Sequence, residues 1–225
     1  DSTVEAFEDS SAQVIADTTD GAAEGNYVVE FTKTSASKHY AGVTVGDLSA
    51  NLVDAIPFDI EGGVTAITAR IHTEEAGKVV RMQVADSASE GDGNWGHAQV
   101  TLDSVGWNEV TFDFAMPVER WVNSWNQNNT TQLSADVVYD EISIFPDWEN
   151  GLTYGGTDFG TPITEPAIYL IDDVQMAEAI DGGSGSTDEE EVVGGGDAAF
   201  DGLEFSADST VEAFEDSSAQ VIADT

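Results

Sequence analysis

Short stretches in which apolar and polar residues alternate run through most of this chain, and they constrain its fold more than any other feature. A period of two places alternate side chains on opposite faces of a strand, so each stretch predicts a β-strand with one buried face. No amphipathic helix of ordinary length competes with them. The alternation is clearest at residues 29–32, 67–72, 80–84 and 109–114, and further strands are predicted at residues 3–7, 12–16, 97–102, 137–145 and 168–176.

About ten short strands in the first ~175 residues predict an all-β fold, an antiparallel β-sandwich of the jelly-roll type. Glycine, asparagine, aspartate and serine fill the segments between the strands, as expected of turns. The composition changes abruptly at residues 179–197, which are rich in glycine, serine and acidic residues and are typical of a flexible linker. We therefore expect a sandwich module over residues 1–178, followed by that linker.

Residues 208–225 are an exact copy of residues 1–18. Exact sequence identity indicates a recent duplication. The spacing between the two copies is long enough for each repeat unit to bury its own core. The sequence therefore predicts a tandem array of whole domains, in which residues 198–225 begin the next unit. A sequence boundary that overlaps the next copy is the alternative. Because a strand needs partners, we expect residues 208–225 to project away from their own sandwich toward a neighbouring copy, joined by peptide linkage or strand exchange.

The chain is strongly acidic, with 44 aspartates and glutamates against six lysines and arginines and a formal net charge of −38. Nucleic acids and anionic membranes need basic surfaces, so neutral ligands and cations remain as partners. The many negative charges also repel one another in the folded protein. This repulsion favours a saline environment, where dissolved ions screen the charges. There is no cysteine and no apolar run of membrane-spanning length. We expect an extracellular or cell-surface protein whose export signal lies outside this sequence.

Several short motifs occur along the chain in a recognisable order. They are FED at 7–9, FTK at 31–33, YAGV at 40–43, PFD at 57–59, GW with VTFDF within 106–114, YDEISIFPD at 139–147 and YLIDDV at 169–174. Over roughly residues 4–177 the chain resembles the jelly-roll carbohydrate-binding modules attached to secreted polysaccharide-degrading enzymes. The resemblance implies an antiparallel sandwich that binds glycan without catalysing a reaction.

Aromatic side chains are the ligand contacts expected of such a module, because their faces stack on the C–H faces of sugar rings. Trp121 and Trp125 are the strongest candidates, since they lie in a polar stretch where no core pattern requires them. Packing of the sandwich is the competing interpretation for each tryptophan, Trp107 above all. The other ligand candidates are Tyr40, Trp95, Trp148 and Arg120.

The resemblance also implies a structural calcium ion between the first and last strands, for which the matching carboxylates are Glu8 and either Asp172 or Asp173. Calcium takes about six to eight oxygen ligands, and residues 86–94 form a second oxygen-rich candidate. In so acidic a chain, neighbouring carboxylates also arise from composition alone. Stability is expected to rise with calcium or salt. Overlapping N-glycosylation sequons begin at Asn128 and Asn129, although such short motifs occur by chance.

The sequence offers little support for an enzyme, because its three histidines show no zinc spacing and no nucleophile elbow is present. Two function classes remain. The exact repeat favours a structural unit of an extracellular fibre or adhesin, whose partners are neighbouring copies packed end to end. The resemblance and the tryptophan pair favour a non-catalytic module that directs a secreted glycoside hydrolase or lyase to polysaccharide. We take the fibre unit as the main hypothesis and the binding module as the alternative.

Overall fold

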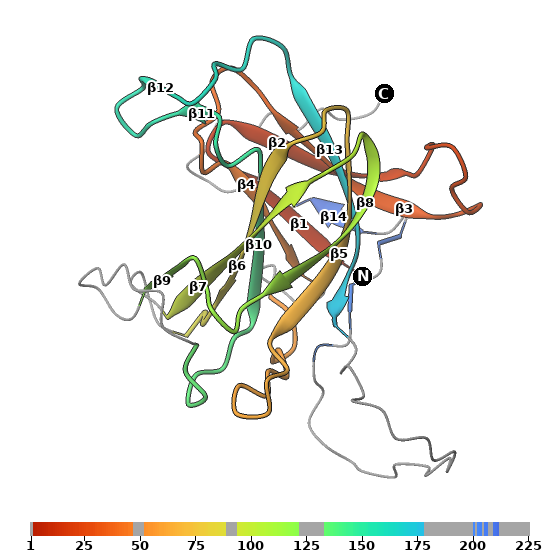
Figure 1. Ribbon diagram of the computed structural model, residues 1–225. Coiled ribbons are helices and arrows are strands. Elements are labelled where there is room, and N and C mark those ends of the chain that lie inside the picture. Colours follow the sequence, from red (N-terminus) through yellow and green to blue (C-terminus); the bar gives the residue numbers. More distant parts are fainter. Residues whose placement is uncertain are drawn as a thin grey trace.

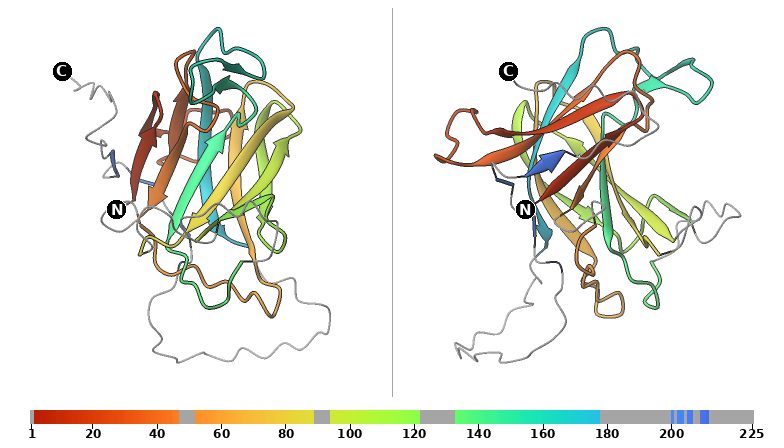
Figure 2. Two further views of the ribbon diagram at one scale, coloured as in Figure 1. Left: turned by 90° about the vertical axis from the view of Figure 1, so that its left-hand side faces the viewer. Right: turned by 180° about the vertical axis from the view of Figure 1, so that it is seen from behind.

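Two β-sheets pack face to face and enclose the core of the protein (Figure 1). The structure is a computed structural model, and it describes residues 2–46, 52–88, 94–121, 133–177, 200, 202–203, 205–206 and 209–211. Further views show the same arrangement from the side and from behind (Figure 2). Among the described residues, no helix has the length and apolar character needed to cross a membrane.

The larger sheet has its strands in the order β14, β1, β4, β10, β6, β7 and β9. All neighbouring strands in this sheet are antiparallel except β1 and β14, which run parallel. The bounds are β14 (Thr210–Val211), β1 (Thr3–Phe7), β4 (Gly42–Gly46), β10 (Glu141–Pro146), β6 (Lys78–Ala85), β7 (Trp95–Leu102) and β9 (Glu119–Trp121).

The smaller sheet has its strands in the order β2, β3, β13, β5 and β8, all antiparallel. A separate hairpin of two short strands, β11 and β12, lies outside both sheets. The bounds are β2 (Ser10–Ala16), β3 (Tyr27–Lys33), β13 (Ala167–Met176), β5 (Ala66–Thr73), β8 (Gly106–Asp113), β11 (Gly151–Leu152) and β12 (Asp158–Phe159).

The alternation along each strand decides which side chains enter the core. Val29 and Phe31 of β3 are fully buried and belong to the same cluster as Ile142 and Ile144 of β10, from the opposite sheet. Burying one such side chain contributes roughly 1.5–3 kcal/mol, so the apolar interior between the sheets is the main source of stability. Lys33 occupies the next inward position of β3 and is also fully buried.

The predicted antiparallel β-sandwich is confirmed, although some strands differ from the prediction. The strand predicted at residues 137–145 begins only at Glu141, after a stretch whose backbone bonds to residues 53–56 and 85. β4 is absent from the predicted strands because Gly42 and Gly46 at its ends hide the alternation. A repeated sandwich is not shown by this structure.

The prediction that residues 208–225 project away from their own sandwich is wrong for the part that the structure describes. Thr210 and Val211 form β14, which pairs with Thr3 and Val4 of β1, the residues of which they are copies. β1 has β4 on one side only, and an open sheet edge offers unpaired N–H and C=O groups to any added strand. The two copies therefore lie side by side in one sheet.

Residues that precede β14 also pack against this sandwich. Phe200, Leu203 and Phe205 are buried and join the cluster between the sheets. The Leu203 amide N–H donates to the carbonyl oxygen of Val174 at 2.8 Å. These apolar residues, predicted to open the next unit, thus extend the core of this one. The boundaries of module and linker, and the tandem array itself, stay predictions.

Candidate functional site

The outer face of the larger sheet carries the candidate site, and strand register places its residues. Met82 of β6 points into the core, so its neighbours Arg81 and Gln83 point outward. His97 and Gln99 of β7 pair with Gln83 and Arg81 across the strands. Because paired residues share a face of the sheet, these four side chains lie together on the outside of the sandwich.

Aromatic rings form one continuous cluster on this outer face. The His97 ring lies 4.6 Å from that of Trp95, 5.2 Å from Phe145 and 5.3 Å from Trp148, centroid to centroid. Phe7 meets Phe145 edge-on at 5.6 Å. We call the whole cluster the aromatic face, and it consists of Phe7, His39, Tyr40, Trp95, His97, Phe145, Trp148 and Phe159.

His39 extends the aromatic face beyond the sheet. Its ring stacks on Phe159 at 4.3 Å and meets Tyr40 edge-on at 5.0 Å and Trp148 edge-on at 5.5 Å. Tyr40 and Trp148 are half-buried and Phe159 is 40% exposed. The aromatic face is therefore built on a buried base but keeps aromatic surface in contact with solvent.

Arg81 holds polar groups against the rings. Its guanidinium carbon lies 4.2 Å from the centroid of the Trp148 ring, a cation–π geometry. Its Nε–H donates to Gln99 Oε1 at 2.9 Å, and an Nη1–H donates to Glu119 Oε2 at 3.0 Å. Arg81, Gln99 and Glu119 thereby form a fixed set of donors and acceptors beside an aromatic surface.

His97 at the centre of the aromatic face is only 3% exposed. Its Nε2 lies 2.9 Å from Gln83 Oε1, an acceptor, so this nitrogen carries the proton in the neutral ring. Burial, with a smaller effect from the nearby Arg81 charge, lowers the pKa of His97 to about 3. The ring is therefore uncharged at neutral pH and acts as part of the aromatic surface.

Hydroxyl and carboxyl groups continue the same face toward β1. Thr44 and Ser143 are cross-strand partners whose hydroxyl oxygens lie 2.8 Å apart, and Glu5 pairs with Thr44 on the other side. Glu141 lies two residues before Ser143 in β10 and so points to the same side of the sheet. Burial, and then the charges of Asp140 and Glu5, raise the pKa of the Glu141 carboxyl group. This part of the face offers oxygen acceptors rather than positive charge.

Phe159 reaches the aromatic face from the β11–β12 hairpin, which backbone hydrogen bonds fix in place. The Leu152 N–H donates to the Ser37 carbonyl oxygen at 2.9 Å, and the His39 N–H donates to the Leu152 carbonyl oxygen at 2.9 Å. Gly151 begins the hairpin with φ at 136°, a conformation that favours glycine. The hairpin and the loop before β4 therefore form one unit.

Gly151→Ala is expected to destabilise the protein by about 2 kcal/mol, through strain at positive φ and close backbone contacts. A Cβ atom at Gly151 would lie 2.8 Å from the His39 amide nitrogen and 2.9 Å from the Ser37 carbonyl oxygen. Thermal or urea unfolding measures the effect. Gly156→Ala is the control, because Gly156 has φ at 75° but a Cβ atom there would have no other atom within 4 Å. An equal loss of stability at both positions would show that the close backbone contacts at Gly151 do not contribute.

Three predicted ligand residues, Tyr40, Trp95 and Trp148, are brought together in the aromatic face. The backbone of Trp121 pairs with Trp95, and that of Arg120 pairs with Gly96, at the edge strand β9. The side chains of Arg120 and Trp121 lie outside the described set. Trp125, Asn128 and Asn129 lie outside the described residues altogether.

Sequence reasoning missed His39, His97, Phe145 and Phe159 as parts of the site. The strand alternation contains a signal for His97 and Phe145, since each follows a buried neighbour and so faces outward. No comparable signal exists for His39, which comes from a loop, or for Phe159, which comes from the two-residue strand β12. Trp107 does not join them, because it packs beneath Arg70 on the smaller sheet at 4.5 Å.

The carboxylates predicted to bind calcium are not brought together. Glu8 lies just before β2, whose first residue Ser10 pairs with Lys33 at the end of β3. Asp172 instead accepts a hydrogen bond at 3.1 Å from Asn26, which precedes β3. Opposite ends of a strand of 7 residues are roughly 20 Å apart. Calcium binding stays a prediction, but this ligand set does not support it.

Asp172 and Asp173 share Arg70 as their cation, at 3.7 Å and 3.1 Å from its Nη1. The three side chains line a pocket of about 290 Å³ beside Trp107. Within the described residues, no group of three or more His, Cys, Asp and Glu side chains could hold a metal ion. Of the second calcium candidate, residues 89–93 lie outside the described part of the chain.

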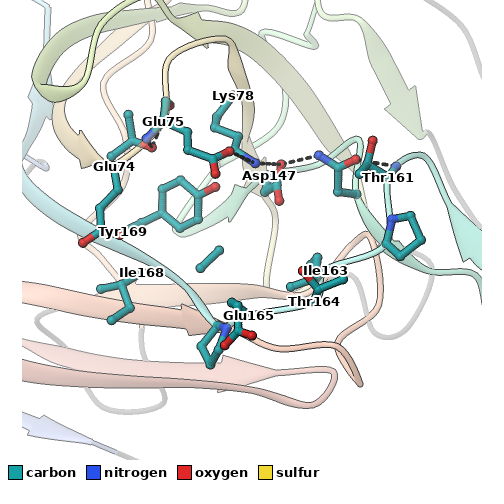
Figure 3. A pocket seen from close by; sticks show the side chains of 15 residues that line it. Glu74, Glu75, Lys78, Asp147, Thr161, Ile163, Thr164, Glu165, Ile168 and Tyr169 are labelled. Carbon is teal, nitrogen blue, oxygen red and sulfur yellow. Dashed lines mark hydrogen bonds and ion pairs between the residues drawn. The ribbon is translucent and has the colours of Figure 1, made fainter.

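A second pocket, of about 360 Å³, is lined by charged, polar and apolar side chains (Figure 3). Lys78 Nζ lies 3.0 Å from Glu75 Oε2 and 3.6 Å from Asp147 Oδ1. Asn150 Nδ2 donates to Asp147 Oδ1 at 2.6 Å. Since Trp148 follows Asp147 in the chain, one backbone segment contributes to both the pocket and the aromatic face.

No protein-family model matches the sequence, and no curated protein matches it either. Solved structures do resemble the fold. One is the family 11 carbohydrate-binding module from Clostridium thermocellum in complex with a β-1,3-1,4-mixed-linked tetrasaccharide, with TM-score 0.43, 11% identity, and coverage of 77% of this chain and 86% of that one.

A second is the family 11 carbohydrate-binding module of the cellulosomal cellulase Lic26A-Cel5E of Clostridium thermocellum, with TM-score 0.44, 12% identity, and coverage of 77% and 85%. A third is an exo-β-agarase, with TM-score 0.44 and 9% identity, for which the match covers 77% of this chain but 22% of the agarase. These similarities are too distant to carry a functional argument, so the function must be argued from the site.

Proposed function

We propose that this chain is a non-catalytic carbohydrate-binding module and that the aromatic face binds a polysaccharide. The supporting observation is the ring cluster itself, which lies on the outer side of a sheet where polar residues normally alternate with core residues. Its rings provide flat apolar surface, and Arg81, Gln99 and Glu119 provide hydrogen bonds for hydroxyl groups. This is the combination that recognition of a sugar chain requires.

The charges favour a neutral polysaccharide over an acidic one. The protein carries a formal net charge of −38, and Glu5, Glu119 and Glu141 lie on the same outer face as the rings. Bringing uronate or sulfate groups to this surface would cost electrostatic energy. A polysaccharide ligand also places the proposed site of action outside the cell.

The test is binding of the whole chain to a panel of soluble polysaccharides by affinity electrophoresis, followed by calorimetry. Mixed-linked β-glucan, xylan, galactan and agarose represent neutral ligands, and alginate and polygalacturonate represent acidic ones. Retardation by at least one neutral polymer, without retardation by the acidic ones, supports the proposal. Binding to none of the neutral polymers, on this panel extended to an array of glycans, contradicts it.

Trp148→Ala is expected to weaken binding to the retained polysaccharide by about 30-fold, because a central aromatic contact is commonly worth ~2 kcal/mol or more. Trp148 touches three rings and the Arg81 guanidinium, so its loss removes both a stacking surface and the support of its neighbours. Calorimetric titration measures the change.

Trp107→Ala is the matched control for Trp148→Ala. Trp107 is also half-buried and also lies beneath an arginine, at 4.5 Å from Arg70, but it belongs to the smaller sheet. Its replacement is expected to leave affinity within about twofold of the wild type. A similar loss from both variants would point to general destabilisation instead of a site at Trp148.

A repeat unit of an extracellular fibre or adhesin stands as a second candidate. The observation that favours it is the exact copy of residues 1–18 at residues 208–225. Light scattering and electron microscopy of the purified chain separate the two candidates, since a fibre unit forms regular filaments. A monodisperse single domain that binds polysaccharide supports the binding module alone.

A further inference from the structure

Lys33 is a charged residue at a position that the strand pattern assigns to the core. It follows Val29 and Phe31 on the inward side of β3 and is 0% exposed. A buried ammonium group is costly unless hydrogen bonds replace the water around it. The aromatic face as described so far makes no use of this side chain, so its burial calls for a separate explanation.

Three backbone carbonyl oxygens surround the Lys33 ammonium group. Nζ lies 2.9 Å from the oxygen of His39, 3.2 Å from that of Pro146 and 2.8 Å from that of Asp147. An ammonium group has three N–H donors, so each carbonyl accepts one of them. Lys33 therefore reaches from the smaller sheet, across the interior, to two separate segments on the far side.

Both of these segments carry rings of the aromatic face. The first contains His39 and Tyr40, and in the second Trp148 follows Asp147 directly. The His39 and Trp148 rings meet at 5.5 Å, where the two segments come together. The carbonyl groups that Lys33 binds thus belong to, or adjoin, the residues whose rings must be aligned.

We propose that Lys33 is a positioning residue of the aromatic face: its ammonium group fixes the two segments so that Tyr40 and Trp148 are presented together to glycan. This inference rests on the proposed function. An apolar side chain of similar length could fill the same space, but it would donate to none of the three carbonyl oxygens; the Asp147 oxygen would keep the N–H of Asn150, at 3.0 Å, as a donor. Those buried acceptors would then move toward other partners and carry the rings with them.

Charged and titratable groups from several elements surround the Lys33 ammonium group and its three carbonyl partners. Asp147, directly after β10, supplies the negative charge. Lys78 of β6 and its partner Glu75 lie beyond it, and Tyr169 of β13 lines the same interior. Burial lowers the pKa of Lys33 to about 8; the charge of Asp147 opposes this shift and that of Lys78 adds to it. Burial also lowers the pKa of His39, so that its ring is neutral where Lys33 titrates.

The test uses the absence of cysteine from the chain. Lys33→Cys introduces a single thiol. This thiol is alkylated in the unfolded protein, and the chain is then refolded. 2-Bromoethylamine produces a lysine analogue with an ammonium group, whereas 1-iodopropane produces a neutral side chain of the same length that has no N–H donor. The probe is the neutral polysaccharide that the wild type binds. Expected are near wild-type affinity for the ammonium adduct and a loss of about tenfold or more for the neutral one.

Lys78→Cys, carried through both alkylations, is the matched control. Its neutral adduct removes the same charge, but the Lys78 ammonium contacts carboxylates and not the three carbonyl oxygens. Affinity is expected to stay within about twofold for both of its adducts. NMR signals of the Trp148 indole and the His39 ring report ring position in all samples. A neutral Lys33 adduct with wild-type ring signals and wild-type affinity overturns the inference.

A titration of the unaltered protein covers the case in which the neutral adduct does not refold. Lys33, Lys38 and Lys78 are its only lysines, so ¹⁵N-lysine labelling resolves the Lys33 Nζ. Ring signals and affinity are expected to change with the midpoint of that nitrogen. Because the folded pKa lies below the unfolded value of ~10.4, the Lys33 contribution to stability rises between them. The titration of Lys33 therefore does not by itself unfold the protein.

Failure of this inference can be distinguished from failure of the proposed function. If the wild type binds no polysaccharide, the proposed function fails, while the ring signals still report whether Lys33 positions the aromatic face. If the wild type binds and its affinity and ring signals stay constant through the Lys33 titration, the proposed function stands and the role of Lys33 is overturned.

Discussion

Acidification from pH 7 to pH 4 is expected to destabilise the fold by roughly 3 kcal/mol through His97 alone. Burial, and then the charge of Arg81, lower its pKa from 6.5 to about 3 in the folded protein. Between these values the unfolded chain binds a proton and the folded protein does not. The stability that neutral His97 provides is therefore complete above pH ~6.5 and is lost as the pH falls toward ~3.

Urea denaturation of the wild type and of His97→Gln, at several pH values from about 7 to about 4, measures this effect. Protonation of the many carboxylates relieves their repulsion in both proteins, so the difference between the two curves isolates His97. That difference is expected to shrink as the pH falls. His72→Gln, on the outer side of the smaller sheet beside Trp107, is the control. Parallel curves for wild type and His97→Gln would contradict the prediction.

Asp147→Asn is expected to cost about 3 kcal/mol, because it removes a buried negative charge that acts on two partly or fully buried cations, Lys33 and Lys78. The Asp147 side chain is 2% exposed and lies 3.6 Å from Lys78 Nζ, and its charge also acts on Lys33. Its backbone has φ at 54°, which asparagine tolerates. The substitution therefore changes charge with little change of volume or backbone strain.

A double-mutant cycle with Lys33→Met measures how much of this cost depends on Lys33. The cost of Asp147→Asn is expected to fall in the Lys33→Met background, since one of the two cations is absent there. Asp158→Asn, on the exposed hairpin, serves as the control and should change stability by less than about 0.5 kcal/mol. An unchanged cost in the Lys33→Met background would mean that Asp147 and Lys33 act independently.

The fold class could be predicted from the sequence because alternation is a local property of each strand. Ile67, Ala69 and Ile71 of β5 are all buried, as their spacing predicts. Sheet order is not local, because it depends on which distant edges meet. The pairing of β1 with β14 shows this most clearly, since identical residues were expected to lie in separate units and instead pair with each other.

The site was only partly predictable for a related reason. Tyr40, Trp95 and Trp148 could be identified by residue type in polar or glycine-rich segments, but not as neighbours of one another. Their contact depends on His39 and His97, which join them from a loop and from β7. The strand pattern places Lys33 on the inward side of β3, but the sequence carries no signal for its role, because that role depends on three backbone carbonyl groups, which every residue carries.

Because Asp147 contributes both to the pocket and to the hydrogen bonds around Lys33, we expect ligand binding at the pocket and at the aromatic face to be thermodynamically coupled. Its carboxylate lines the pocket beside Lys78 (Figure 3). Its carbonyl oxygen accepts a hydrogen bond from Lys33, immediately before Trp148 in the chain. A solute in the pocket alters affinity at the aromatic face to the extent that it shifts the Asp147 backbone, and not only its carboxylate. By linkage, a ligand on the aromatic face then alters affinity for that solute by the same factor.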